Sequence, residues 1–184
     1  MPQTKPRFVR LASVIVAALL LTVAAETAVL AVAVAKTGKA VTAVKVVTQS
    51  TLATTTSSTY ANMPDMSTTI TVPTNQQALL LITFSAETDC KLVEVEFGYC
   101  LMRVLVDGSP AAPGQVIFDG TWNNRGGTNP EGDQVSMQAN SMQFVAGPLG
   151  SGSHTVTVQW LVNDPLENQF RVQERTLSVL RARV

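Results

Sequence analysis

Two cysteines and one histidine carry the most reactive side chains of this 184-residue chain. Cys90 and Cys100 stand ten positions apart, and one histidine with no further cysteine cannot complete the usual zinc ligand set. The pair also lacks the Cys-x-x-Cys spacing of dithiol exchange. We therefore predict a disulfide that staples a hairpin. A redox or metal role is the alternative.

The single histidine, His154, is the first residue of an alternating strand pattern and lies on the apolar face of that pattern. We therefore expect it to be packed against the core or at a strand edge. The chain contains no Gly-x-Ser-x-Gly elbow, no glycine-rich phosphate loop and no His-Glu-x-x-His motif. A facing carboxylate pair, as in glycosidases, is a spatial feature that spacing does not reveal. We predict that the protein is not an enzyme. A small carbohydrate-active enzyme remains an alternative.

The best candidate ligand site is the 15-residue stretch 119–133, in which Gly, Asn and acidic residues surround one tryptophan. Loops of this length in a compact domain are often functional. Trp122 has a ring that can stack on a sugar, and Asn123, Asn124 and Arg125 can bond to sugar hydroxyls. A loop with Trp122 packed back onto the domain is the alternative.

The same stretch holds three carboxylates, at Asp119, Glu131 and Asp133. Ca²⁺ takes six to eight oxygen ligands, so these side chains form a weak candidate calcium site. Their spacing matches no EF-hand loop. We expect no other cofactor.

Short runs rich in Val, Thr and Leu, separated by Gly, Pro and Asn turns, follow Tyr60. Two of them, Ala78–Ala86 and Tyr99–Val106, flank the cysteines and form the predicted central hairpin. The cleanest alternation runs from His154 to Val162 and predicts a buried face with Val156, Val158 and Trp160. Seven or eight strands without a convincing helix predict an all-β, antiparallel β-sandwich of the jelly-roll type.

The N-terminus combines a basic start with the apolar run Leu11–Ala25 and a second apolar run, Thr27–Ala35. This pattern predicts a hydrophobic helix at residues 1–35 that serves as a signal peptide or, read through Glu26, as a membrane anchor. Either reading, together with the cysteine pair, predicts a secreted or cell-surface protein. An ordinary helix is a further alternative.

Residues 36–59 are rich in Ser and Thr and poor in large apolar side chains after Val47, so they predict a flexible linker. A first strand at Val41–Val47 is the alternative. The sandwich domain is then expected at residues 60–184.

The net charge of zero hides an asymmetry, because residues 1–59 carry six basic residues and one acid. Residues 60–184 carry seven basic and twelve acidic residues, which disfavours nucleic acid as a partner. A solvated strand face, rather than an anion site, is the expected role of the basic residues in the last strand: Arg171, Arg175, Arg181 and Arg183. We expect contact with a membrane only through the N-terminal segment.

The run from Gly147 to Trp160, preceded by Ser141-Met142-Gln143, resembles uncharacterised exported bacterial β-sandwich proteins. Its glycine turn followed by an alternating strand is also similar to the jelly rolls of the tumour-necrosis-factor and complement-C1q group. The resemblance covers about a quarter of the chain. It implies a jelly-roll fold and a trimer, and it carries over no site residues. The collagen-like tail of the C1q relatives is absent from this sequence.

These observations predict an exported, non-catalytic binding or interaction module whose partner is an extracellular carbohydrate or protein. A structural homo-oligomer of jelly rolls is the second hypothesis, and the small carbohydrate-active enzyme is the third.

Overall fold

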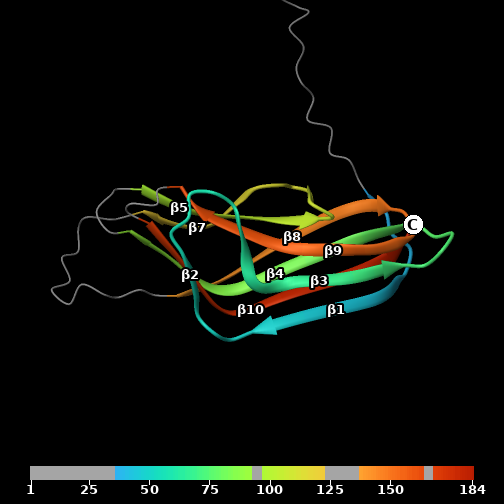
Figure 1. Cartoon of the computed structure of the whole chain (residues 1–184), viewed down its shortest axis with the longest axis horizontal. Coiled ribbons are helices and arrows are strands. Elements are labelled where there is room, and N and C mark those ends of the chain that lie inside the picture. Colours follow the sequence, from blue (N-terminus) through green and yellow to red (C-terminus); the bar gives the residue numbers. More distant parts are fainter. Residues whose placement is uncertain (1–35, 93–96, 123–136, 164–167) are drawn as a thin grey trace, which may run out of the picture. The chain divides into compact units, whose positions relative to one another are not determined.

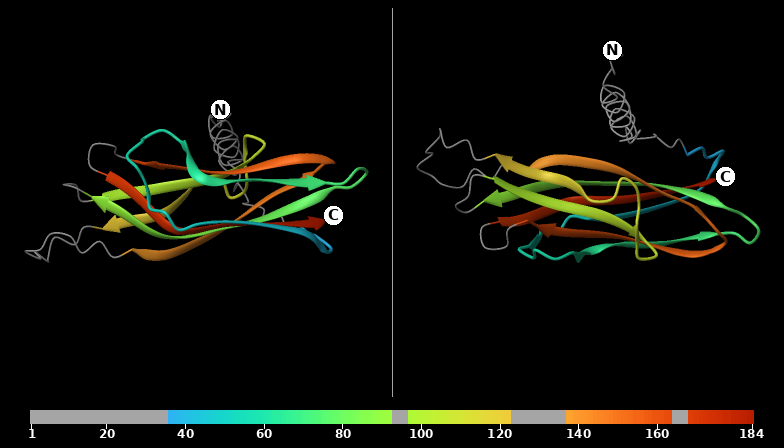
Figure 2. Two further views of the ribbon diagram at one scale, coloured as in Figure 1. Left: turned by 60° about the horizontal axis from the view of Figure 1, so that its bottom comes forward. Right: turned by 90° about the horizontal axis from the view of Figure 1, so that it is seen from above.

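A computed structural model describes residues 36–92, 97–122, 137–163 and 168–184, which form ten strands in two antiparallel sheets (Figure 1). The chain divides into two units, Met1–Ala35 and Lys36–Val184, and the sheets belong to the second. The described residues therefore fold as an all-β sandwich, as the sequence predicts. Figure 2 shows the two layers from two further directions.

Sheet A has the strand order β1-β10-β4-β8, and β2 pairs with β10 beyond the end of β1. Its strands are β1 (Val41–Gln49), β2 (Ala53–Thr55), β4 (Ala78–Leu92), β8 (Gln138–Leu149) and β10 (Asn168–Arg183). Neighbouring strands in sequence do not pair within this sheet. Its ladders join segments that are distant along the chain, such as Thr88 with Gln138 and Gln49 with Arg175.

Sheet B has the strand order β3-β9-β5-β6, and β7 also pairs with β5. Its strands are β3 (Ala61–Val72), β5 (Phe97–Val106), β6 (Ser109–Pro110), β7 (Val116–Trp122) and β9 (Gly152–Val162). Strand β9 lies between β3 and β5, and its register with β5 places Leu101 opposite Leu161 and Arg103 opposite Gln159.

The core between the sheets follows from period-two burial. Val156, Val158 and Trp160 of β9 are buried, which confirms the face predicted from the sequence. On the facing side of the core, sheet A contributes the buried residues Phe84 and Phe170. The centroids of the Trp160 and Phe170 rings lie 5.6 Å apart. The other core residues include Met66, Ile70, Leu80, Ile82, Met102, Val104, Phe144, Val172, Leu177 and Val179.

The segment 36–59, predicted as a flexible linker, instead contributes two strands to sheet A. Strand β1 pairs with β10 from Val41 to Gln49, and β2 continues along the same edge. Ala43, Val47 and Ala53 pack against the core. The prediction was wrong because the partner of this segment, β10, lies at the far end of the chain, and its ladder bonds offset the low apolar content.

The core residues of the sandwich all lie between Ala43 and Val179. Residues 36–184 therefore contain both sheets and the whole of the described core, and we expect them to fold without the preceding 35 residues. The predicted signal peptide or anchor at residues 1–35 lies outside the described residues. Within the described ranges, no helix is long and apolar enough to cross a bilayer.

Candidate functional site

The disulfide predicted between Cys90 and Cys100 is present, with Cα atoms 5.7 Å apart and both residues buried. It does not staple a hairpin, because β4 belongs to sheet A and β5 to sheet B. The bond therefore ties one layer of the sandwich to the other, which is a correction to the sequence prediction. A cystine within the protein is consistent with an extracytoplasmic location.

The strand ends next to the disulfide gather at one end of the sandwich, which we call the cystine end. The registers pair Asn168 with Leu92 and Phe97 with Trp122, and they place Thr88 opposite Gln138. Strand β7, which holds the first residues of segment 119–133, therefore ends here. The backbone of that segment is described up to Trp122, which ends β7. The predicted ligand residues Asn123, Asn124 and Arg125 lie outside the described residues, as do Glu131 and Asp133.

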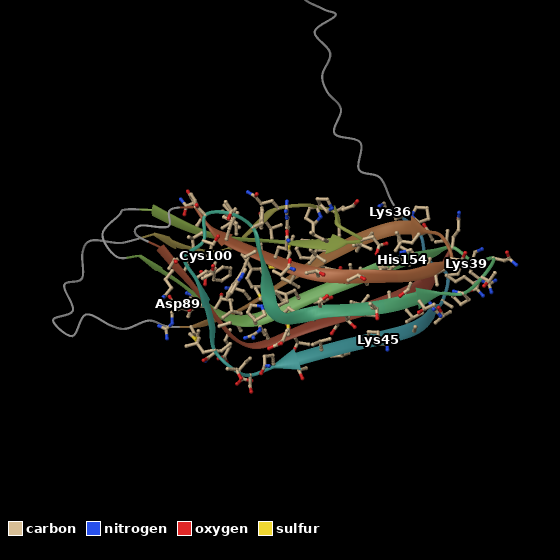
Figure 3. The ribbon with its side chains drawn as sticks, viewed as in Figure 1. Lys36, Lys39, Lys45, Asp89, Cys100 and His154 are labelled. Atoms are coloured by element: carbon tan, nitrogen blue, oxygen red, sulfur yellow. A yellow bond between two sulfur atoms is a disulfide. The ribbon has the colours of Figure 1, made fainter. Side chains whose placement is uncertain are left out.

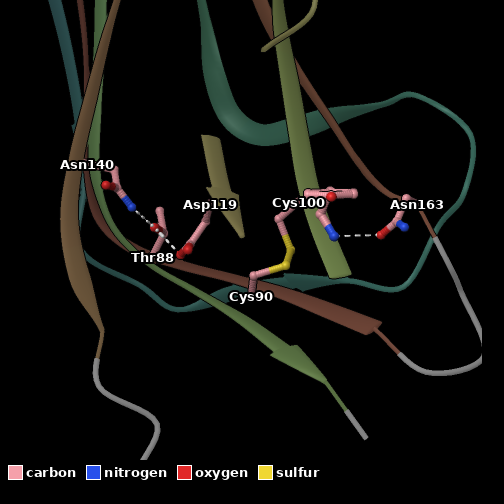
Figure 4. The surroundings of a disulfide bond; sticks show 7 residues. Thr88, Cys90, Cys100, Asp119, Asn140 and Asn163 are labelled. Atoms are coloured by element: carbon pink, nitrogen blue, oxygen red, sulfur yellow. Dashed lines mark hydrogen bonds between the residues drawn. A yellow bond between two sulfur atoms is a disulfide. The ribbon is translucent and has the colours of Figure 1, made fainter. Parts of the chain in front are cut away.

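Asp119, the first residue of the predicted calcium set, lies in a polar cluster beside the disulfide (Figure 4). Its Oδ2 atom accepts a hydrogen bond of 2.7 Å from the hydroxyl of Thr88, which is fully buried. The Thr88 Oγ1 atom in turn accepts one of 2.7 Å from the Asn140 side-chain amide. This chain of bonds gives Asp119 a structural role at the junction of β4, β7 and β8. Among the described residues, no group of three His, Cys, Asp or Glu side chains could hold a metal ion.

The outer face of sheet B, next to the cystine end, carries an apolar row that crosses three strands. Leu101 of β5 lies directly opposite Leu161 of β9 on one side and Ile117 of β7 on the other. Opposed residues on antiparallel strands point to the same side of a sheet. Ile117 is 59% exposed, so the row is open to solvent at its β7 end.

A polar row runs beside the apolar one, two residues further along β5. The Arg103 Nε–H donates to Gln159 Oε1 at 2.9 Å, and the Gln159 amide donates to Asn62 Oδ1 at 2.8 Å. The guanidinium carbon of Arg103 lies 3.9 Å from the centre of the Tyr60 ring, which is a cation–π contact. The Tyr60 hydroxyl donates to Gln115 Oε1 at 2.8 Å.

Partial burial of Tyr60 on this face changes its acidity. Loss of contact with water raises the pKa of the phenol, and the positive charge of Arg103 partly counters that effect. Tyr60 therefore stays a neutral donor at physiological pH. This matters because the hydroxyl is committed to Gln115 and fixes the ring in place.

Tyr99 extends the outer face toward the cystine end. It lies opposite Gly120, where a Cβ atom would sit 3.6 Å from the Tyr99 ring. The backbone N–H of Tyr99 donates to Asn163 Oδ1 at 2.6 Å, and the Asn163 N–H donates to the Tyr99 carbonyl at 3.0 Å. Tyr99 remains 42% exposed, so an aromatic ring is presented next to the strand that ends at Trp122.

We call these residues the sheet-B platform: Tyr60, Asn62, Tyr99, Leu101, Arg103, Gln115, Ile117, Gln159 and Leu161. The platform offers aromatic and aliphatic surface beside amides and a guanidinium whose positions are set by mutual hydrogen bonds. It can therefore bind a partner that presents both apolar faces and hydroxyl or carbonyl groups. Alternation within one strand is enough to put Tyr99, Leu101 and Arg103 on the same face. The sequence analysis missed Tyr60, Gln115 and Asn62, because only the register between strands brings them there.

His154 lies at the opposite end of the sandwich and is part of no platform. Its Nδ1 is 2.7 Å from Asp107 Oδ2, and its Nε2 is 2.9 Å from the Gly150 carbonyl. Both neighbours are acceptors, so this arrangement favours a ring with a proton on each nitrogen. The bond to Asp107, with a smaller contribution from Gly150, raises the pKa of His154, and the same bond lowers the pKa of Asp107.

A His154→Gln variant tests this pair through the pH dependence of stability. Because the folded-state pKa of His154 is raised, its contribution is complete below about pH 6.5 and fades as pH rises through the folded-state pKa. The lowered pKa of Asp107 keeps the contribution in place down to about pH 4. We expect the variant to lose about 0.5–1 kcal/mol at pH 5.5 and clearly less at pH 9, as measured by urea unfolding. An equal loss at both pH values would contradict the assignment.

Comparisons with known proteins add little to this geometry. No protein-family model matches the sequence, and no curated protein sequence matches it. Among solved structures, the chain is similar to part of dimeric latent PorU from Porphyromonas gingivalis, with 9% identity and a TM-score of 0.39. The match covers 81% of this chain and 14% of that one, so this chain spans about a seventh of the length of PorU. A likeness at this level carries no argument about function.

Proposed function

We propose that this protein is an exported, non-catalytic binding or interaction module, and that the sheet-B platform is its ligand surface. The observation that carries the proposal is the pair of adjacent rows on one open face, one apolar and one polar. A sugar chain or a protein surface matches such a face, since each combines apolar area with hydroxyl, amide or carbonyl groups. Trp122, the last residue of β7, and Asn123–Arg125, which lie outside the described residues, are included in the proposed ligand site.

The platform is suited to binding because its polar side chains are already ordered. Arg103 is held by Gln159 and stacked on Tyr60, so little side-chain entropy remains to be lost when a ligand arrives. The Arg103 guanidinium can also donate further hydrogen bonds to a ligand, because it carries five N–H groups and the bond to Gln159 uses one of them. An exposed sheet face of this kind fits an extended ligand better than a small molecule, which needs a concave pocket.

Export and jelly-roll topology are part of the same proposal. The basic start and apolar run at residues 1–35 support export, and the disulfide agrees with an oxidising compartment. The strand pairs are nested: the first strand pairs with the last, and each later pair lies inside the previous one along the chain. These pairs are β1–β10, β3–β9, β4–β8 and β5–β7. A jelly roll of two Greek keys is built from such nested pairs, so the pairing supports that topology.

Tyr99 provides the sharpest test of the ligand surface. Residues 36–184 would be applied to a glycan array and, in parallel, to a panel of extracellular proteins. A Tyr99→Ala change is expected to weaken the bound ligand at least about tenfold, because exposed aromatic anchors carry much of the energy of such contacts. Trp122→Ala should act in the same direction. Leu52→Ala is the matched control, since Leu52 is 43% exposed and precedes β2 of sheet A. Binding that is unchanged by both aromatic substitutions would remove the platform as the ligand surface.

A structural homo-oligomer is the second candidate, and β1 favours it. This edge strand exposes Val41, Val44 and Val46, each more than half accessible to solvent. A long edge rich in exposed β-branched residues is a template for pairing with another chain. Sedimentation equilibrium of residues 36–184 tests this candidate, and a monomer at micromolar to millimolar concentration would count against it.

A further inference from the structure

The end of the sandwich opposite the cystine end carries a concentration of positive charge. We call it the basic end and define it by Lys36, Lys39, Arg181 and Arg183. The backbone N–H of Lys39 donates to the Arg183 carbonyl at 2.8 Å, which brings the segment before β1 against the last residues of β10. The Lys36 ammonium reaches the Gly147 carbonyl at 2.9 Å, at the end of β8. Figure 3 shows Lys36, Lys39 and His154 toward this end, and Asp89 and Cys100 toward the other.

The positive charge of the basic end is not cancelled by neighbouring side-chain carboxylates. Within the described residues, the acid at this end is Asp107, and its carboxylate is committed to His154 and to the Thr155 N–H. Arg181 bonds to the hydroxyl and carbonyl of Thr42 and to the Thr71 carbonyl, which are neutral acceptors. The basic end therefore keeps a net positive charge.

An open polar depression of about 580 Å³ lies at the same end. The turn between β3 and β4 lines it with Thr74, Asn75, Gln76 and Gln77, and β10 adds Arg183 and Val184. Amide N–H groups beside a guanidinium are good donors for phosphate oxygens. The depression thus offers room and donors for an anionic headgroup next to exposed lysines.

We propose that the basic end rests on an anionic lipid surface, which revises the expectation that only the N-terminal segment contacts a membrane. The charge of these cations is complementary to phosphate headgroups. Chain order selects lipid over other polyanions, because Lys36 directly follows the apolar runs Leu11–Ala25 and Thr27–Ala35, which together, read through Glu26, have the length of a membrane span. The sheet-B platform and the cystine end do not contain the residues that define the basic end, so the proposed membrane contact leaves the proposed ligand surface free.

The expected effect per cation follows from membrane electrostatics. Each Lys or Arg near an anionic surface strengthens binding about fivefold at low salt, and the effect falls off within about 10 Å at an ionic strength of 0.1 M. Binding by the domain alone is therefore weak, and attachment through residues 1–35 would raise its effective concentration at the surface. Vesicle binding must accordingly be measured at millimolar lipid concentration.

The test uses residues 36–184 with vesicles of phosphatidylcholine, with and without 30% phosphatidylglycerol, followed by sedimentation of the vesicles. We expect the domain to bind the anionic vesicles at least about tenfold better at 50 mM NaCl and to lose this preference at 500 mM. Lys36→Gln, Lys39→Gln and Arg183→Gln should each weaken binding about fivefold. Equal binding to both kinds of vesicle would overturn the proposal.

Lys45→Gln is the matched control, because Lys45 is an exposed lysine in the middle of β1, opposite Val179. Val179 lies four positions before Arg183 on β10, which is about 13 Å along a strand. We expect this variant to bind within about twofold of the parent. A loss equal to that of Lys39→Gln would mean that total charge, not the basic end, is responsible. Full displacement by 10 mM inorganic phosphate at constant ionic strength would assign the depression to free phosphate and would also overturn the proposal.

Discussion

Replacement of Arg175 by alanine is expected to destabilise the sandwich by about 3–5 kcal/mol, because it removes a buried side chain that donates to three backbone carbonyls. Arg175 is 2% exposed although it lies on the strand predicted to have a solvated basic face. Its Nη1 donates to the Thr51 carbonyl at 2.5 Å and lies 3.4 Å from the Val172 carbonyl. Its Nη2 lies 3.4 Å from the Pro64 carbonyl.

The geometry of β10 explains why an arginine occupies this buried place. The ladder of β10 with β4 shifts register between Gln173 and Thr176, and Glu174 adopts a φ of 43°. At the same point the edge partner of β10 changes from β1 to β2. The connection between those two strands leaves the Thr51 carbonyl outside the ladder, and the guanidinium supplies the missing donor. Because Pro64 belongs to β3, the same side chain also links the two sheets.

Burial lowers the pKa of the Arg175 guanidinium, and the nearby Asp65 carboxylate opposes this shift. An arginine remains charged in a protein at any physiological pH, so its contribution should not depend on pH in this range. Two further variants separate the effect of lost side-chain volume from the effect of lost hydrogen-bond donors. Arg175→Met keeps most of the volume but no donor, and Arg175→Lys keeps one charge that cannot reach both sheets. We expect both to fall between the parent and the alanine variant.

Urea unfolding of residues 36–184 measures these differences. Arg183→Gln is the control, since Arg183 lies on the same strand but is exposed, and its removal should change stability by less than about 0.5 kcal/mol. If Arg175→Met were as stable as the parent, the hydrogen bonds from the guanidinium to the backbone carbonyls would not stabilise the sandwich, and Arg175 would have no such structural role.

Reduction of the disulfide is the second large effect. The Cys90–Cys100 bond closes a loop of about 11 residues, for which the chain-entropy relation gives about 2.7 kcal/mol of stabilisation. The bond also joins β4 to β5 across the two sheets, where no ladder connects these strands. We therefore expect the oxidised protein to unfold at a higher urea concentration than the reduced protein, with a free-energy difference of about 2–4 kcal/mol.

A double variant, Cys90→Ala with Cys100→Ala, separates the covalent bond from other effects of the reductant. Its unfolding midpoint should lie near that of the reduced parent and should not respond to reductant. Identical midpoints for the oxidised and reduced parent would contradict the prediction. Native-state hydrogen exchange should further show that the loss of protection begins in β4 and β5 at the cystine end, because the released constraint acts there first.

The disulfide also bears on the proposed ligand surface. Tyr99 stands next to Cys100 on β5, and its ring lies against Gly120 of β7. If reduction loosens this end of the sandwich, a ligand bound through Tyr99 should be held less tightly by the reduced protein. The basic end lies at the other end of the strands, so its binding to anionic vesicles should not change on reduction.

The sequence by itself determined the class of fold, the cysteine pair and the buried faces of single strands. Alternation in β9 predicted that Val156, Val158 and Trp160 are buried, and they are. Each of these conclusions depends on periodicity within a few residues or, for the disulfide, on there being only two cysteines to pair. Such information comes from residues that are close in the sequence, so it can be interpreted without knowing which strand is the partner.

Pairing between distant strands decided the rest. Segment 41–55 joins sheet A only because β10 supplies its ladder, and the cystine links the two sheets only because β4 and β5 fall in different layers. The buried Arg175 depends on a register shift, and the sheet-B platform depends on the alignment of β7, β5 and β9. Hydrogen bonds between strands are non-local, and the backbone groups that make them are the same for every residue except proline. The side-chain pattern of one segment therefore cannot specify which distant segment will lie beside it.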